Sequence, residues 1–195
     1  MRVALFGGSF NPPHVAHQLV ALYVLETQPV DELWMIPCFQ HPFEKSLQPF
    51  ADRLEMCRRA ADGLGGRVRV SEVEGELGGG SRTLRTVQAL QAAHPGHQFS
   101  LVIGSDLQAE TASWYGAEQL RRLVPFVVVG RGGHAPGEAE QATKQATVTA
   151  VTMPEISSSD VRRRLRDGLP VDQLVPRRVL DYIQERGLYG KVEEP

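Results

Sequence analysis

Hydrophobic and polar positions in this chain follow two alternating patterns. The short apolar run Val3–Phe6 is followed by two glycines, and apolar residues then recur every three or four positions from about His14 to Glu26. A short apolar run is typical of a buried parallel strand, and the three-to-four spacing is typical of a helix that packs on one side. Pro12 and Pro13 precede the helix, where proline is tolerated. The opening residues therefore predict a strand, a glycine turn and a helix.

The same unit recurs along the rest of the chain. Further strands are predicted at Glu32–Ile36, Arg67–Val70, Phe99–Ile103, Phe126–Val129 and Thr147–Val151. Helices are predicted along the apolar positions Phe50, Leu54, Cys57, Ala61 and Leu64, along Leu84, Val87 and Leu90, and at about Ser158–Arg166 and Pro176–Arg186. Residues 78–80 are expected to form a mobile loop, and Gly130–Thr143 a long surface loop near a site.

Strands that alternate with helices predict a doubly wound α/β domain with a parallel sheet. We expect residues 1–195 to form one domain, of which about 155–195 is a small helical part at the C-terminus. Ligands in such folds bind beyond the carboxyl ends of the strands. Gly7, Gly104 and Gly130 each follow a predicted strand, so their loops are expected to form one pocket.

Composition and charge make local chemistry decisive. The 195 residues carry 21 Lys and Arg against 23 Asp and Glu, a formal charge of −2. This balance gives no overall attraction for nucleic acid or anionic lipid. No stretch approaches the roughly 18 apolar residues of a membrane span, and the N-terminus lacks the pattern of a signal peptide. The two cysteines form neither a zinc pattern nor a disulfide framework, so a cytoplasmic protein without nucleic-acid or membrane partners is expected.

The turn Gly7-Gly8-Ser9-Phe10-Asn11 leads into the first helix and carries the strongest chemical signal. Glycines let a ligand approach the backbone, and the start of a helix offers free N–H groups to an anion. His14 and His17 lie three residues apart in the first helical turn, so they share one face. An isolated histidine is more often structural, but a pair behind a glycine turn indicates donors for a phosphoryl group.

The turn resembles the (T/S)FxPxHxxH signature of the HxGH-type nucleotidyltransferases. Three further stretches have the order and spacing of the nicotinate mononucleotide adenylyltransferase family, and the tail Pro176–Tyr189 also resembles its ending. These stretches are Ser81-Arg82-Thr83 with Thr86, Ile103-Gly104-Ser105-Asp106 with Trp114-Tyr115, and Ile156-Ser157-Ser158-Ser159 with Arg162. The resemblance covers nearly the whole chain and implies a Rossmann-like fold. It also implies adenylyl transfer from ATP to nicotinate mononucleotide, with release of pyrophosphate, in NAD biosynthesis.

The resemblance also implies roles for individual residues. The catalytic group would be His14, His17, Lys45 and Arg162. ATP would be bound by Gly7, Gly8, Ser9, Phe10, Asn11, His14, His17, Gly104, Asp106, Ile156, Ser157, Ser158 and Arg162. The pyridine mononucleotide would be bound by Thr83, Trp114, Tyr115 and Arg131. Some of these residues also have a purely structural alternative. Serines before a helix are ordinary caps, Asp106 can cap the helix that follows it, and a tryptophan can be a core residue.

Several positions depart from the family pattern. Asn11 stands where the family commonly has Asp, and Arg82 stands where it usually has Tyr. Arg82 could pair with a substrate carboxylate or face solvent. Lys45 and His41 compete for the role of the family's basic residue after the second strand. Mg²⁺ is expected to arrive with ATP, held mostly by triphosphate oxygens and water, without a dedicated metal cage in the protein.

Three other readings stay open at this point. The acceptor could be nicotinamide mononucleotide or another phosphorylated compound. The chain could instead be a nucleotide sensor without turnover, although two retained imidazoles argue against it. A zinc site made of His14, His17 and His41 is disfavoured, since the pair lacks HExxH spacing and neither cysteine is placed to help. The sequence leaves the oligomeric state open.

Overall fold

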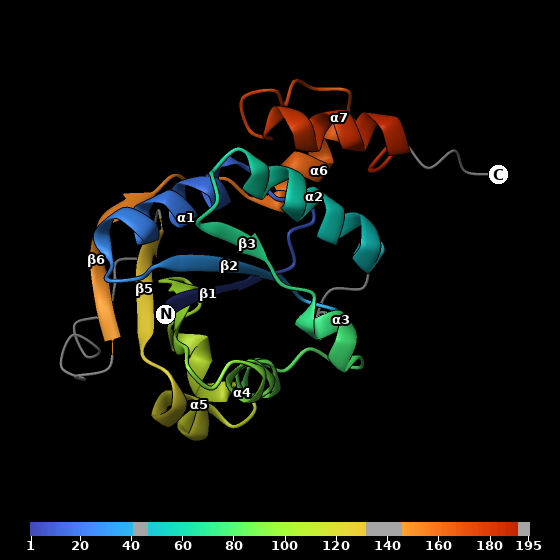
Figure 1. Cartoon of the computed structure of the whole chain (residues 1–195). Helices are drawn as coiled ribbons and strands as arrows, with labels where there is room; N and C mark the ends of the chain where they lie inside the picture. Colours follow the sequence, from blue (N-terminus) through green and yellow to red (C-terminus); the bar gives the residue numbers. More distant parts are fainter. Residues whose placement is uncertain (41–46, 132–145, 191–195) are drawn as a thin grey trace.

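The fold is a parallel sheet with helices on both faces, as the alternating pattern predicts. A computed structural model describes residues 1–40, 47–131 and 146–190 (Figure 1). Six strands pair in the order β3-β2-β1-β4-β5-β6, and every pairing is parallel. The strands are β1 (Arg2–Gly8), β2 (Glu32–Pro37), β3 (Val68–Val70), β4 (Gln98–Gly104), β5 (Phe126–Arg131) and β6 (Ala146–Met153).

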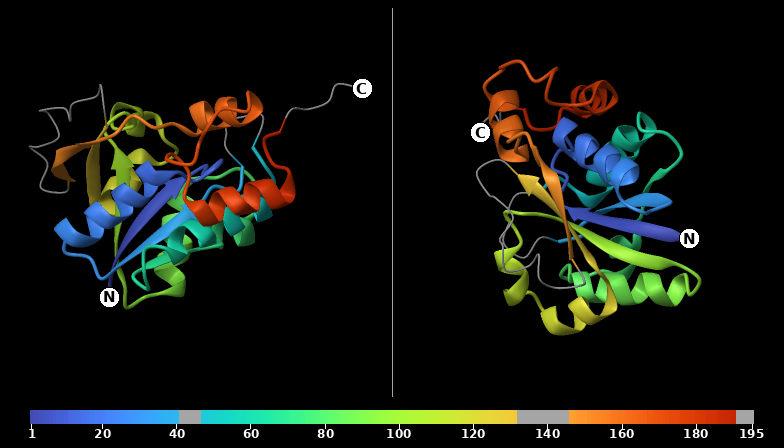
Figure 2. Two further views of the ribbon diagram at one scale, coloured as in Figure 1. Left: turned by 90° about the horizontal axis from the view of Figure 1, so that it is seen from above. Right: turned by 90° about the vertical axis from the view of Figure 1, so that its left-hand side faces the viewer.

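The helices are α1 (Val15–Thr27), α2 (Phe50–Asp62), α3 (Val73–Leu77), α4 (Thr83–Ala93), α5 (Ala117–Leu123), α6 (Ser158–Arg166) and α7 (Arg177–Arg186), with a 3₁₀ helix at Ala109–Ser113. The predicted helices correspond to α1, α2, α4, α6 and α7, and the structure adds α3, α5 and the 3₁₀ helix. In Figure 1, α1 and α2 cover one face of the sheet, and α4 and α5 cover the other. Figure 2 shows the same two layers from other directions. The doubly wound class is confirmed.

Side-chain alternation along β1 divides the interior into two cores. Val3 and Leu5 pack with residues of α4 and α5, whereas Ala4 packs with residues of α1 and α2. Successive side chains of a strand point to opposite faces, so one central strand serves both cores. β1 and β4 are neighbours in the sheet, and the helices that follow them lie on opposite faces. That switch point is where such folds place ligands.

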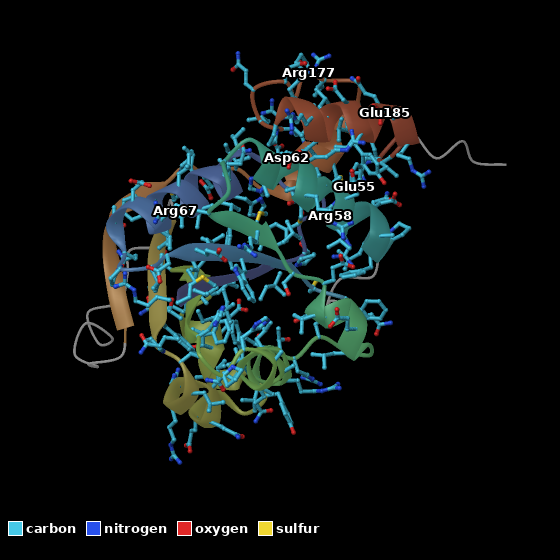
Figure 3. The ribbon with its side chains drawn as sticks, viewed as in Figure 1. Glu55, Arg58, Asp62, Arg67, Arg177 and Glu185 are labelled. Carbon is cyan, nitrogen blue, oxygen red and sulfur yellow. The ribbon has the colours of Figure 1, made fainter. Side chains whose placement is uncertain are left out.

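The C-terminal helices form a third core against the outer side of α2. Met56 and Ala60 of α2 are buried among residues of α6, α7 and the segment between them, including Val161, Val179 and Ile183. Figures 1 and 3 show α7 lying over α2, with Glu55 and Asp62 on α2 and Arg177 and Glu185 on α7. This helical part therefore shares a hydrophobic core with the sheet domain.

The structure departs from the sequence prediction mainly in short elements. β1, β4 and β5 continue through the glycines that were expected to end them. Helices α3 and α5 have five and seven residues, which is too short for the three-to-four pattern to stand out. Much of the expected long loop after Gly130 lies outside the described residues. Mobility of residues 78–80 stays a prediction, although Gly78 and Gly79 have the positive φ values that favour glycine.

Within the residues that the structure describes, no helix has both the length and the apolar character needed to cross a bilayer.

Candidate active site

A cleft of about 710 Å³ opens at the carboxyl ends of β1 and β4. Its walls come from the segments that follow β1, β2, β4 and β6, from the end of β5, and from α3 and the start of α4. The three glycines that follow predicted strands, Gly7, Gly104 and Gly130, all line it. The three glycines thus border one pocket, as expected, while the loop after Gly130 lies outside the described residues.

The first wall of the cleft is the glycine turn after β1. Gly7, Gly8 and Ser9 line the cleft. A side chain at Gly7 would meet no protein atom within 4 Å, whereas one at Gly8 would press against the Phe10 ring at 3.2 Å. Bare backbone thus faces open space at Gly7, and a ligand could approach it closely.

The two predicted histidines stand together on this wall. His14 is the N-cap of α1 and only 3% exposed, and its ring stacks on that of His17 with centroids 3.8 Å apart. The backbone N–H of His14 donates to Nδ1 of His17 at 3.1 Å. An Nδ1 that accepts this bond carries no proton, so the neutral His17 ring is a donor through Nε2. The edge of Phe10 packs on the same ring, with centroids 4.9 Å apart.

The second wall begins at the N-terminus of α6. Ser157 caps this helix, since its Oγ accepts the N–H of Asp160 at 3.1 Å. Ile156, Ser158 and Arg162 line the cleft. Ser158 Oγ donates to the carbonyl of Pro12 at 2.9 Å, and Arg162 Nη1 donates to the carbonyl of Asn11 at 2.8 Å. Helix α6 is thus hydrogen-bonded directly to the segment that carries the glycine turn.

The end of β4 supplies a carboxylate. Asp106 lines the cleft two residues after Gly104, and its carboxylate lies so close to Gly104 that a Cβ there would overlap with it. A side chain at position 104 would therefore require the Asp106 carboxylate to move. Glu110 and Glu74 also line the cleft.

The part of the cleft on the α4 and α5 side of the sheet carries aromatic side chains. Thr83, Trp114 and Tyr115 line it, and Trp114 also packs partly on the core of α4 and α5. Tyr115 is 62% exposed, and the Arg82 guanidinium lies over its ring at 5.5 Å. Arg82, for which the sequence left two roles open, therefore lies at the cleft beside an exposed aromatic ring.

Three predicted ATP-binding residues, Phe10, Asn11 and Ser157, are absent from the described lining of the cleft, and their contact with ATP stays a prediction. The Phe10 side chain is in the core with α1, and Asn11 is fully buried. Ser157 uses its hydroxyl as the helix cap. Lys45 and His41 lie outside the described residues, and Arg131 ends β5 without a described side chain.

Sequence reasoning missed two buried ionic residues beside the cleft. Glu74 of α3 accepts the Thr86 hydroxyl at 2.8 Å and the Phe39 N–H at 3.1 Å. Arg53 of α2 is 1% exposed and donates to four backbone carbonyls, those of Gln48, Ser9, Cys38 and Phe39. A signal existed for Arg53, because it interrupts the apolar face that Phe50, Leu54 and Cys57 mark.

The chemistry of the cleft suits a phosphorylated nucleotide. Imidazoles, a guanidinium, a helix start and bare glycine backbone gather on one side, and aromatic rings gather on the other. Donors of this kind stabilise charge on phosphoryl oxygens, and exposed rings stack on bases. Within the described parts of the chain, no group of three or more His, Cys, Asp or Glu is arranged to hold a metal ion.

A nucleotide-binding α/β domain is the class that this fold and cleft define. Residues 5–164 match the family model described as "Cytidylyltransferase-like". The chain belongs to this cytidylyltransferase-like family.

Relatives and solved structures extend the comparison over nearly the whole chain. The chain is 48% identical over 190 residues to a protein of Anaeromyxobacter sp. (strain K) described as "Probable nicotinate-nucleotide adenylyltransferase", with 96% of each chain covered. A Myxococcus xanthus protein of the same description is 38% identical, with 100% of this chain and 98% of that protein covered. The fold matches a Plasmodium falciparum nicotinic acid mononucleotide adenylyltransferase complexed with NaAD, with a TM-score of 0.82, 22% identity, and 96% and 97% of the two chains covered.

Proposed function

We propose that this protein transfers the adenylyl group of ATP to nicotinate mononucleotide, forming nicotinate adenine dinucleotide and pyrophosphate in NAD biosynthesis. The observation that carries the proposal is the stacked His14 and His17 pair, which lies in a nucleotide-sized cleft at the sheet's switch point. Relatives that share 38% and 48% of their residues with the chain bear the corresponding name. Residues 1–195 act as one domain in this proposal.

The reaction requires positioning more than proton transfer. A phosphate oxygen of the mononucleotide attacks the α-phosphorus of ATP, the new P–O bond forms, and the bond to the bridging oxygen of pyrophosphate breaks. The attacking phosphate monoester is already anionic near pH 7, so no general base is needed. Negative charge grows on the α-phosphoryl oxygens and on the leaving pyrophosphate.

The residues of the two walls have distinct roles in this scheme. His17 donates through Nε2, because its Nδ1 is engaged by the backbone of His14. His14 and Arg162 supply further hydrogen bonds or positive charge to the phosphoryl oxygens. The Gly7-Gly8 backbone and the start of α6 receive the rest of the triphosphate. Lys45 stays the expected additional cation for the β- and γ-phosphates.

Mg²⁺ accompanies ATP in this proposal. When bound, it neutralises triphosphate charge and stabilises the departing pyrophosphate. Asp106 is the cleft carboxylate closest to the end of β4, and we assign it to the ATP ribose hydroxyls, with ATP oxygens and water holding the ion. Removing the metal with a chelator is expected to abolish turnover.

The acceptor side determines the choice between acid and amide forms of the pyridine. Trp114 or Tyr115 stacks on the pyridine ring in this scheme, and Thr83 at the start of α4 offers hydroxyl and backbone donors to the carboxylate. Arg131 is assigned to the substrate loop through the family resemblance. The location proposed is the cytoplasm, which is compatible with the burial of both cysteines.

A direct test measures pyrophosphate release from MgATP with nicotinate mononucleotide and with nicotinamide mononucleotide. The proposal expects turnover with the acid at a higher kcat/KM than with the amide. A preference for the amide would reassign the acceptor, and no release with either compound would refute adenylyl transfer to a pyridine nucleotide.

His17→Ala separates an enzyme from a nucleotide sensor. Loss of one such donor is expected to lower kcat by about 10²–10³-fold, while the Kd for MgATP changes little. His97→Ala is the control, since His97 packs near Trp34 and Phe99, away from the cleft residues. Equal losses of binding and turnover in the His17 variant would favour a sensor.

A further inference from the structure

We propose that Tyr189, three residues after the end of α7, is a positioning residue. It holds the glycine turn in the conformation that binds the nucleotide. Its hydroxyl donates to Oδ1 of Asn11 at 2.7 Å, across 178 positions of sequence. Tyr189 is 8% exposed and Asn11 is fully buried. Tyr189 is absent from the described lining of the cleft, so it acts through Asn11 and does not touch substrate.

Asn11 is the point at which four segments meet. Its Oδ1 accepts both the Tyr189 hydroxyl and the backbone N–H of Gln48, the latter at 3.2 Å. Its own carbonyl accepts Arg162 Nη1 at 2.8 Å. The residue thus joins the glycine turn to the segment before α2, to α6 and to the C-terminal tail. A shift of Asn11 would be transmitted in both directions, to Ser9 and to His14.

The C-terminal part holds the next residues of the turn as well. Ser158 Oγ donates to the Pro12 carbonyl, and the Val15 N–H donates to the Leu174 carbonyl, both at 2.9 Å. The segment from Asn11 to Val15 is therefore bonded to residues that follow it by more than a hundred positions. His14 belongs to this segment and contacts His17 directly. The imidazole pair is consequently placed by the C-terminal part as well as by α1.

A tight turn after α7 brings Tyr189 to this position. Helix α7 ends at Gly187 with φ of 61°, and the Leu188 N–H donates to the Ile183 carbonyl at 2.9 Å. This pattern is a Schellman motif, which reverses the chain at a helix end. Tyr189 itself has φ of 61°, a conformation that is unfavourable for a bulky side chain. Packing and the bond to Asn11 compensate for this cost.

The electrostatic environment keeps the Tyr189 hydroxyl a donor. Burial raises the pKa of Tyr189 well above its usual value, and the nearby Arg162 and Arg53 oppose that shift without cancelling it. A neutral hydroxyl therefore persists through the working pH range.

The matched pair Tyr189→Phe and Tyr182→Phe tests the inference. Tyr182 also lies in the C-terminal part, and its hydroxyl donates to Asp52 Oδ1 at 2.8 Å, a contact with α2 and not with the turn. Each substitution removes one hydroxyl and keeps the ring. We expect Tyr189→Phe to lower kcat/KM for ATP about tenfold, the most that one typical hydrogen bond contributes, and Tyr182→Phe to change it less than twofold. Equal kinetic effects, or none from Tyr189→Phe, would overturn the proposal.

The kinetic comparison rests on the proposed function. A second readout, which needs no turnover, is independent of it. The imidazole ¹⁵N signals of His17, assigned with a His17→Gln variant, report the Nε2–H tautomer without turnover. They should shift in Tyr189→Phe and stay unchanged in Tyr182→Phe. If the wild type makes no dinucleotide, adenylyl transfer fails as the function, while these signals still decide the role of Tyr189. Unchanged His17 signals in Tyr189→Phe would refute it.

A double-mutant cycle tests whether Tyr189 acts through Asn11. MgATP affinity is measured for Asn11→Ala, Tyr189→Phe and the double variant. If Tyr189 acts through Asn11, Tyr189→Phe should weaken binding in the wild-type background and add less than twofold in the Asn11→Ala background. Additive effects would show that Tyr189 acts by another route.

Discussion

The buried guanidinium of Arg53 gives a prediction about stability that the structure makes quantitative. It donates to the carbonyls of Cys38 at 2.7 Å, Ser9 at 2.9 Å, Gln48 at 2.9 Å and Phe39 at 3.1 Å. These carbonyls belong to the segments after β1 and β2 and to the segment before α2. Arg53→Met keeps much of the length of the side chain and removes every donor.

The expected loss follows from the carbonyls that would be left without this donor. A buried unsatisfied polar group costs about 1–3 kcal/mol, so four carbonyls set an upper range of roughly 4–12 kcal/mol. Water can reach some of these loop carbonyls, and Met avoids burying a charge. We therefore expect the free energy of unfolding to fall by about 3–5 kcal/mol, around the low end of the range for four fully unsatisfied carbonyls. Arg53→Lys should lose less, because an ammonium offers three donors.

Urea denaturation followed by far-ultraviolet circular dichroism and tryptophan fluorescence measures this loss. The control is Arg178→Met, which removes an ion pair with Asp62 in which both side chains are more than 60% exposed. Exposed pairs contribute about 0–1 kcal/mol. A loss in Arg53→Met no larger than that in the control would refute the view that Arg53 ties the cleft loops together. The KM for ATP should also rise in Arg53→Met, because Ser9 and Cys38 line the cleft.

Three further predictions concern single groups. Gly104→Ala should displace the Asp106 carboxylate and raise the KM for ATP about tenfold, the value of a hydrogen bond to a charged group, whereas Gly96→Ala has open space and should not. Burial raises the pKa of the Cys57 thiol and so disfavours the reactive thiolate. In a Cys38→Ser variant, a disulfide reagent should therefore label Cys57 only as the protein unfolds. Fast labelling of the native protein would contradict this. Burial also raises the pKa of Tyr189 in the folded protein, whereas a tyrosine in the unfolded chain has a pKa of about 10. Its contribution to stability is therefore complete below that pH and lost as pH rises above it, and denaturation midpoints at pH 8 and 11 should differ less in Tyr189→Phe than in wild type.

Local sequence patterns predicted most of the fold, because each pattern depends on the conformational preferences of only a few neighbouring residues. The glycines after Phe6, the prolines before α1 and the apolar spacing of α2 and α4 each specify an element by its own backbone preferences. The parallel doubly wound sheet follows from their alternation, and the pocket follows from the place where the strands end. Short helices such as α3 and α5 escaped, since five or seven residues hold too few apolar positions to show a period.

The direction of side chains in the turn was not a local property. Phe10 and Asn11 stand in the motif beside Ser9, yet the ring of Phe10 joins the core and Asn11 faces Tyr189. Both outcomes depend on partners far along the chain, which no spacing rule within the motif reveals.

The sequence by itself determined the order of the strands and of the longer helices along the chain, the glycine turn and the presence of two imidazoles on one helical face. Only the tertiary structure decided which of these residues face the cleft and which support it. Arg53, Glu74 and Tyr189 have their roles through contacts that span 5 to 178 positions. Buried polar groups must find partners wherever the folded chain brings them, and that search is settled by packing in three dimensions.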